Sequence, residues 1–160
     1  MIKRGEVFIT NSFEGTQKLG EEFVERISGQ GRALSKSTTI ALYGDLGSGK
    51  TTFVQGMAKG LGIKRRIISP TFIIVRNYEL GIRSQELGRN NFYHIDLYRI
   101  QNEKDIESLG IEEIISDPQN IVAIEWAEKM AKFLPKERWD VKFEYLGEDK
   151  RKITIKKFSI

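Results

Sequence analysis

Residues 44–51 combine residue types and spacing that suit phosphate binding. They read Gly-Asp-Leu-Gly-Ser-Gly-Lys-Thr and fit the pattern G-x-x-x-x-G-K-[ST] of a P-loop. Glycines let the backbone turn tightly, and the turned backbone directs N–H groups at an anion. In such a loop Lys50 reaches the β- and γ-phosphates of a nucleotide, and the Thr51 hydroxyl ligates Mg²⁺. The candidate nucleotide contacts of this stretch are Leu46, Gly47, Ser48, Gly49, Lys50, Thr51 and Thr52.

A P-loop enzyme also needs a carboxylate near its Mg²⁺, usually at the end of an apolar strand. Glu125 meets this condition because it follows the apolar run at 121–124, and Asp96 closes a second strand-like segment. We predict that Lys50, Asp96 and Glu125 are catalytic, and that Thr51 and Glu125 hold the metal. The alternative for each acid is an ordinary surface carboxylate at a strand end.

Two further positions leave the choice between chemistry and structure open. His94, the only histidine, lies two residues before Asp96, so both side chains project from one strand face and could handle a proton together. A histidine that is simply hydrogen-bonded within the fold is the alternative. Thr71, in Ser69-Pro70-Thr71, could sense the γ-phosphate, or the segment could be a plain loop-to-strand junction.

The elements around the P-loop have the order that the motif requires. Residues 38–43 are β-branched and apolar, which predicts a buried strand. After the loop, Phe53, Met57 and Leu61 recur every four residues, which predicts a helix that ends near Gly62. An accidental lysine in a glycine-rich turn would not require this strand, loop and helix.

The rest of the chain predicts an α/β fold in a single P-loop domain, residues 1–160. Its sheet is expected to be mostly parallel in the centre, with antiparallel strands added by a middle pair and a C-terminal hairpin. Predicted strands cover 6–10, 72–78, 91–97, 121–124 and the hairpin at 141–155. Predicted helices cover 16–28, 102–109, 111–115 and 127–133. The polar segment 79–90 is predicted to be a loop.

Composition excludes several classes of protein. The chain has 160 residues, no cysteine and 39% hydrophobic residues, so disulfides and thiolate metal sites are excluded. No apolar run reaches membrane-spanning length and no signal peptide is recognisable, so we expect no membrane association and a cytoplasmic location. A net charge of +4, with many lysines near the C-terminus, fits either a solvated face or an RNA contact. ATP is favoured over GTP because the guanine-reading motif Asn-Lys-x-Asp is absent.

The order of the motifs resembles one known family, the bacterial TsaE (YjeE) ATPases. The resemblance covers nearly the whole chain. It is carried by the P-loop, Ser-Pro-Thr-Phe at 69–72, Tyr-His-Ile-Asp-Leu-Tyr-Arg at 93–99, Leu-Gly-Ile-Glu-Glu at 109–113 and Ile-Glu-Trp-Ala-Glu-Lys at 124–129.

This resemblance implies an Mg²⁺-dependent ATPase that supports formation of N6-threonylcarbamoyladenosine in tRNA, together with the partner proteins TsaB and TsaD. The tRNA would be reached through that complex. Thr71 would belong to a switch segment, and Trp126 would lie near the nucleotide. The turn from Asn11 to Phe13, together with Arg151, would contact the adenine.

Two other functions use the same P-loop. A small-molecule or nucleoside kinase would transfer phosphate to a hydroxyl compound, and a scaffold would bind ATP without turnover. No arginine lies at an obvious position to reach the phosphates, so we expect the isolated chain to be a weak ATPase that partner proteins stimulate. The oligomeric state is not predicted.

Overall fold

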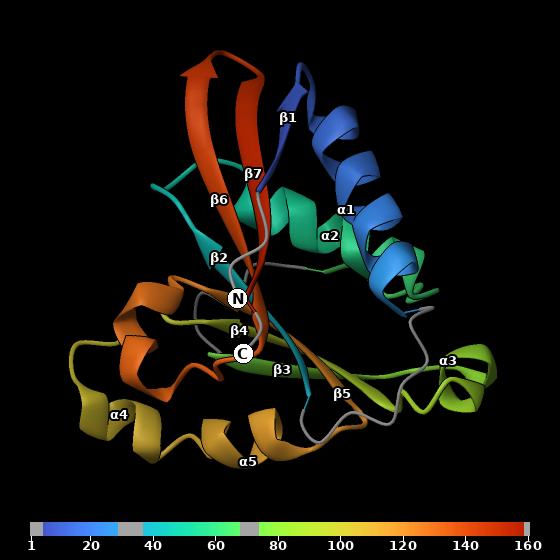
Figure 1. Ribbon diagram of the computed structural model, residues 1–160, viewed down its shortest axis with the longest axis vertical. Coiled ribbons are helices and arrows are strands. Elements are labelled where there is room, and N and C mark those ends of the chain that lie inside the picture. Colours follow the sequence, from blue (N-terminus) through green and yellow to red (C-terminus); the bar gives the residue numbers. More distant parts are fainter. Residues whose placement is uncertain (1–4, 29–36, 68–73, 159–160) are drawn as a thin grey trace.

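The computed structural model describes residues 5–28, 37–67 and 74–158. Within them, seven strands form one sheet in the order β1-β7-β6-β2-β5-β4-β3, and helices pack on both of its faces (Figure 1). The strands are β1 (Glu6–Thr10), β2 (Thr38–Tyr43), β3 (Val75–Glu79), β4 (Asn91–Asp96), β5 (Asn120–Glu125), β6 (Arg138–Gly147) and β7 (Lys150–Phe158).

Parallel strands occupy the centre of the sheet and antiparallel strands its edges. β2 pairs in parallel with β5 and β6, and β4 pairs in parallel with β5. The pairs β3–β4, β6–β7 and β1–β7 are antiparallel. The predicted mixed α/β sheet with a parallel centre and two antiparallel additions is therefore confirmed.

Each face of the sheet has its own apolar core. Helices α1 (Phe13–Ser28) and α2 (Lys50–Gly60) cover one face. Helices α4 (Glu103–Glu107) and α5 (Ile111–Ser116) and the 3-10 helix η1 (Ala127–Phe133) cover the other. All six residues of β5 are buried, as its continuous apolar run predicts for a strand covered on both faces.

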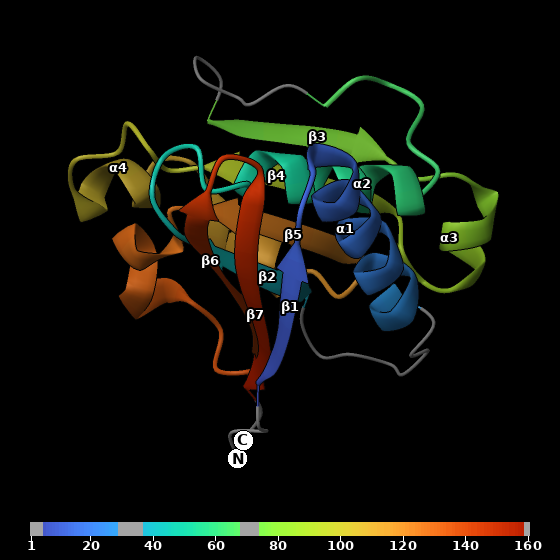
Figure 2. The same ribbon diagram turned by 90° about the horizontal axis from the view of Figure 1, so that it is seen from above.

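Helices α1 and α2 lie side by side at unusually short range, because glycines form their contact (Figure 2). A β-carbon added to Gly56 would lie 1.9 Å from the carbonyl oxygen of Gln17, and one added to Gly20 would lie 2.2 Å from that of Phe53. Only glycine permits this approach of two backbones. The contact holds the first turn of α1 beside the first turn of α2.

Several predicted boundaries are wrong, for local reasons. Helix α1 begins at Phe13, not at residue 16, because the Ser12 side chain caps it by accepting the Gly15 N–H at 2.9 Å. The segment 79–90 is not only loop. It contains helix α3 (Ile82–Glu86), which begins after Gly81 and is closed by Gly88 at a φ of 78°. Residues 72–73 of the strand predicted at 72–78 lie outside the described residues.

None of the described helices is long and apolar enough to span a bilayer.

Candidate nucleotide-binding site

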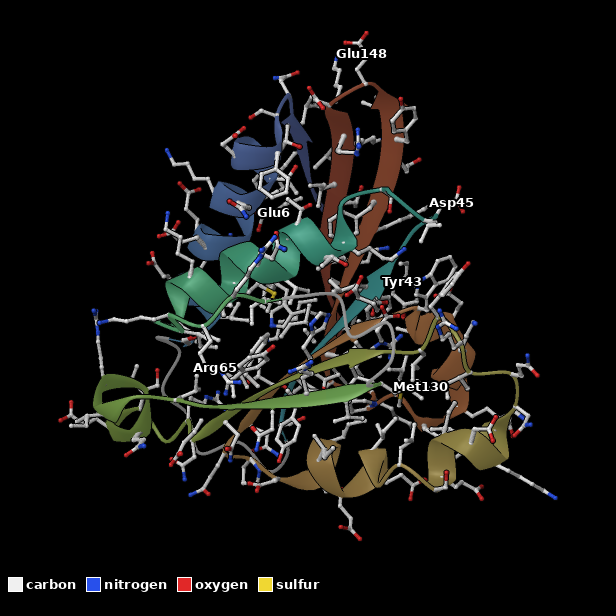
Figure 3. The ribbon with its side chains drawn as sticks, turned by 180° about the vertical axis from the view of Figure 1, so that it is seen from behind. Glu6, Tyr43, Asp45, Arg65, Met130 and Glu148 are labelled. Carbon is white, nitrogen blue, oxygen red and sulfur yellow. The ribbon has the colours of Figure 1, made fainter. Side chains whose placement is uncertain are left out.

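The glycine-rich loop connects the end of β2 to the start of α2. Gly44, Gly47 and Gly49 all have positive φ values, of 145°, 77° and 106°, which side chains would disfavour. Gly49 is the residue that precedes α2, so the loop runs directly into a helix N-terminus. Figure 3 shows Asp45 at the outer end of this loop, where its side chain is exposed. The turned backbone followed by a helix start is the geometry of an anion site.

Lys50 is folded back over the loop in this conformation. Its amine donates to the carbonyl oxygens of Gly44 and Asp45, the latter at 3.1 Å, and lies 4.1 Å from the centre of the Trp126 ring. Burial lowers the pKa of the amine, and the nearby carboxylates, Glu125 first among them, act in the opposite direction. A phosphate ligand would have to replace two loop carbonyls as the partner of this amine.

The two predicted carboxylates lie at the carboxyl ends of neighbouring parallel strands. Asp96 ends β4 and Glu125 ends β5, and the sheet register pairs them directly. Glu125 accepts a hydrogen bond from the Thr51 hydroxyl at 2.8 Å, which joins the P-loop helix to the central sheet. Asp96 accepts the backbone N–H of Tyr98 at 3.0 Å.

Of the two alternatives for His94, the structure shows an imidazole that is hydrogen-bonded within the fold and not paired with Asp96. The imidazole instead contacts Glu125, with Nε2 2.5 Å from Oε2. His94 and Asp96 do share a strand face, but the register of β4 and β5 places the Glu125 carboxylate within reach of the ring. Strand periodicity alone could not supply this contact between two chain segments.

The cleft in front of these groups has a volume of about 310 Å³. The turn after β4 forms part of its wall, and the Lys129 amine holds this turn by donating to the carbonyls of Tyr98 and Ile100 at 2.5 and 3.1 Å. Trp126 adopts a left-handed backbone conformation with a φ of 58°, and its ring lies 5.3 Å from that of Tyr98. A bulky residue in that conformation is uncommon and marks a constrained site.

The β6–β7 hairpin contributes Arg151 to the opposite wall. Its guanidinium donates to the carbonyls of Glu148 at 2.6 Å and Gly47 at 3.2 Å, and it lies 4.7 Å from the Tyr145 ring centre. Glu148 marks the hairpin tip in Figure 3. The hairpin is thereby attached to the glycine-rich loop.

Most of the predicted site residues converge on this one cleft. Asn11 does not line it, whereas its neighbours Ser12 and Phe13 do. Thr71 lies outside the described residues. The predicted residues that line the cleft are Phe13, Leu46, Gly47, Ser48, Gly49, Lys50, Thr51, Thr52, Asp96, Glu125, Trp126 and Arg151.

Five further lining residues were not predicted from the sequence. Tyr98 and Arg99 could have been found, because they follow Asp96 just beyond the carboxyl end of a central strand, where ligands bind in α/β sheets. Arg99 lines the cleft in addition to the predicted Arg151. The five are Thr16, Ile74, Tyr98, Arg99 and Asp149.

The described residues hold no cluster of three or more His, Cys, Asp or Glu side chains that could bind a metal alone. The oxygens present, from Thr51, Asp96 and Glu125, are hard donors of the kind that Mg²⁺ accepts. Mg²⁺ is usually held by one or two carboxylates together with substrate phosphates. The donor set therefore fits a metal that binds along with a nucleotide.

Comparison with known proteins places the chain among proteins of one kind. A sequence model of the family "Threonylcarbamoyl adenosine biosynthesis protein TsaE" matches residues 10–153. A tRNA threonylcarbamoyladenosine biosynthesis protein TsaE from Bacillus subtilis is 41% identical over 116 residues, which is 72% of this chain and 67% of that protein. The TsaE protein of Rickettsia bellii is 34% identical over 148 residues, 92% of each chain.

A solved structure agrees with this assignment. The crystal structure of Bacillus subtilis YdiB superposes with a TM-score of 0.71 at 27% identity, covering 99% of this chain and 88% of that one. The family match spans the P-loop, both strand-end carboxylates and most of the hairpin. The chain therefore belongs to the TsaE family of threonylcarbamoyl adenosine biosynthesis proteins.

Proposed function

We propose that this chain is a P-loop ATPase that hydrolyses ATP with Mg²⁺, and that the hydrolysis serves the tRNA modification for which its family is named. One observation carries the proposal. The hydrogen bond between Thr51 and Glu125 brings the last residue of the loop and a strand-end carboxylate, 74 positions apart, into the cleft that Lys50 also lines. Phosphoryl transfer needs this combination of lysine, hydroxyl and carboxylate around one position.

The loop has features that favour occupation by phosphate. The Ser48 hydroxyl is buried, with no hydrogen-bond partner among the described residues. A side chain at Gly47 would meet no atom within 4 Å, so the backbone there faces open space. Thr51 and Glu125 would hold Mg²⁺, which when bound neutralises charge that develops on phosphate oxygens.

Each residue of the cleft has a distinct task in this proposal. Lys50 leaves the loop carbonyls and donates to the phosphate oxygens, where its charge stabilises the transition state. Glu125 would either hold Mg²⁺ together with Thr51 or orient the attacking water. Phe13 and Arg151 contact the base at the far end of the cleft, and Trp126 closes the site beside Lys50 and excludes water.

TsaB and TsaD are the partners in this proposal. The isolated chain is expected to turn over slowly, because its Lys50 amine is already engaged by two carbonyls and an aromatic ring. A partner that releases this lysine would raise the rate. Partner-supplied groups in other P-loop proteins are worth ~10³ or more. Contact with tRNA is then made by the complex.

The test is ATP turnover by the parent chain, Lys50→Ala and Lys59→Ala, each with and without the TsaB–TsaD pair. Lys59→Ala is a matched control, because this substitution removes the same charge from the exposed side of the same helix. We expect slow, Mg²⁺-dependent phosphate release that the pair stimulates, near-complete loss in Lys50→Ala and no change in Lys59→Ala. Parent-level turnover in Lys50→Ala would refute the ATPase assignment. Phosphate found on a small hydroxyl compound instead of in solution would favour a kinase.

A further inference from the structure

The only histidine of the chain is buried in the sheet, directly behind the candidate catalytic carboxylate. His94 is 0% exposed and Glu125 is 2% exposed. Each oxygen of the carboxylate has its own partner: Oε2 contacts His94 Nε2 at 2.5 Å, and Oε1 accepts the Thr51 hydroxyl at 2.8 Å. The two partners come from different parts of the fold, one from the sheet and one from the P-loop helix.

The sheet register explains why the imidazole reaches Glu125. His94 is paired across the ladder with Ala123, and Asp96 is paired with Glu125. His94 and Asp96 are two residues apart on β4, and their partners Ala123 and Glu125 are two residues apart on β5. All four side chains therefore project from the same face of the sheet. Ala123 carries only a methyl group, which leaves space beside the ring for a diagonal contact with the longer glutamate side chain.

With Glu125 ionised, the hydrogen of this contact is assigned to Nε2. A carboxylate can only accept, so the imidazole nitrogen facing it must donate. The other nitrogen, Nδ1, is buried and has no hydrogen-bond partner among the described residues. Buried acceptors without partners are less rare than buried N–H groups without partners, which agrees with a ring that carries its hydrogen on Nε2.

We infer that His94 is a positioning residue, which holds Oε2 of Glu125 and leaves Oε1 for the reaction. The inference rests on the proposed ATPase function. Thr51, the partner of Oε1, belongs to the loop that would engage metal and phosphate, so this contact is exchanged when a nucleotide binds. His94, the partner of Oε2, is fixed in the sheet core, so its contact with Glu125 is kept. The carboxylate therefore keeps its orientation while Oε1 becomes available.

Two substitutions at His94 separate positioning from simple packing. His94→Leu removes the donor, whereas the amide nitrogen of His94→Gln lies about as far from the backbone as Nε2 and can still donate. Removing a group that orients a metal-binding or catalytic side chain typically costs about 10- to 100-fold in activity. We expect His94→Leu to lower kcat for ATP hydrolysis by that factor with little change in KM, and His94→Gln to recover most of it.

Thr39→Val is the matched control. It also removes a buried side-chain hydrogen bond from the central sheet, the one to Ser37 at 2.8 Å, but makes no contact with Glu125. Its kcat should equal that of the parent. Parent-level kcat in His94→Leu overturns the inference. A second result would also overturn it: kcat falls in His94→Leu, His94→Gln does not restore it, and both variants show the same fall in melting temperature. That pattern is expected if His94 contributes packing alone.

A spectroscopic measurement tests the contact without depending on hydrolysis. Because the chain has a single histidine, ¹⁵N-histidine labelling gives one imidazole signal set. We expect a slowly exchanging, downfield Nε2–H resonance that changes strongly in Glu125→Gln and persists when Mg²⁺ and a non-hydrolysable ATP analogue are added. A rapidly exchanging ring, or one insensitive to Glu125→Gln, overturns the inference. An inactive parent that keeps this resonance would refute the ATPase proposal while leaving the contact established.

Discussion

Replacing Gly56 with alanine places a methyl group where helices α1 and α2 leave no room for one. The added carbon would lie 1.9 Å from the carbonyl oxygen of Gln17 and 2.7 Å from its carbonyl carbon. Ordinary contact begins at 3.4 Å, so the helices must separate by about 1.5 Å at this point. The obstacle is backbone and cannot rotate away as a flexible side chain could.

The net cost follows from two opposing effects. Overpacking in a dense core costs about 1–3 kcal/mol, and a rigid backbone obstacle places this site at the upper end, about 3 kcal/mol. Alanine favours a helix over glycine by about 1 kcal/mol, which offsets part of this. We therefore expect Gly56→Ala to lower the free energy of unfolding by about 2 kcal/mol.

Urea unfolding followed by far-ultraviolet circular dichroism measures this loss. The control is Gly81→Ala, where an added β-carbon meets no atom within 4 Å and the φ of −73° suits any residue. The control should stay within about 0.5 kcal/mol of the parent. Gly56→Ala should also weaken ATP binding, because α1 carries Phe13 and Thr16 into the cleft. A Gly56→Ala chain as stable as its control would contradict the close packing described for these helices.

Two further substitutions test individual side chains. Glu125→Gln should keep the fold and most of the nucleotide affinity but slow single-turnover phosphate release by ~10²; a parent-level rate would transfer the role to Asp96. Tyr43→Phe should remove one late step from the tyrosine absorbance titration, because burial and the Asp140 carboxylate raise the pKa of Tyr43 to about 12. Since the folded-state pKa is the higher one, this residue's contribution to stability is complete below pH 10 and is lost as the pH rises towards 12. A titration curve unchanged by the substitution would rule out this assignment.

Local sequence patterns were sufficient for the elements that carry the glycine-rich loop. The strand at 38–43 and the helix after it follow from residue periodicity, and the structure has them at Thr38–Tyr43 and Lys50–Gly60. The helix predicted at 102–109 is also present as α4, which begins after Asn102, whose side chain accepts the Asp105 N–H at 3.1 Å. These features depend on neighbours within a few residues of one another.

Features that depend on register between distant segments could not be read in this way. The contact of His94 with Glu125 requires the pairing of β4 with β5, and the place of Arg151 beside Gly47 requires the hairpin to join β2 through β6. Helix α3 was missed because its five residues include no buried side chain, so no apolar periodicity marks it.

The sheet position of β1 determines when during synthesis this edge can form. Glu6–Thr10 pairs with residues 151–155, near the other end of the sequence. At about 5–20 residues per second, a ribosome needs roughly 7 to 28 s to make the intervening chain. During that interval β1 has no partner in this sheet, and Phe8 lacks the β7 residues that it packs beside. Because Ser12 and Phe13 follow β1 directly, the edge strand that leads into this wall of the cleft takes its place only after residues 151–155 have been made.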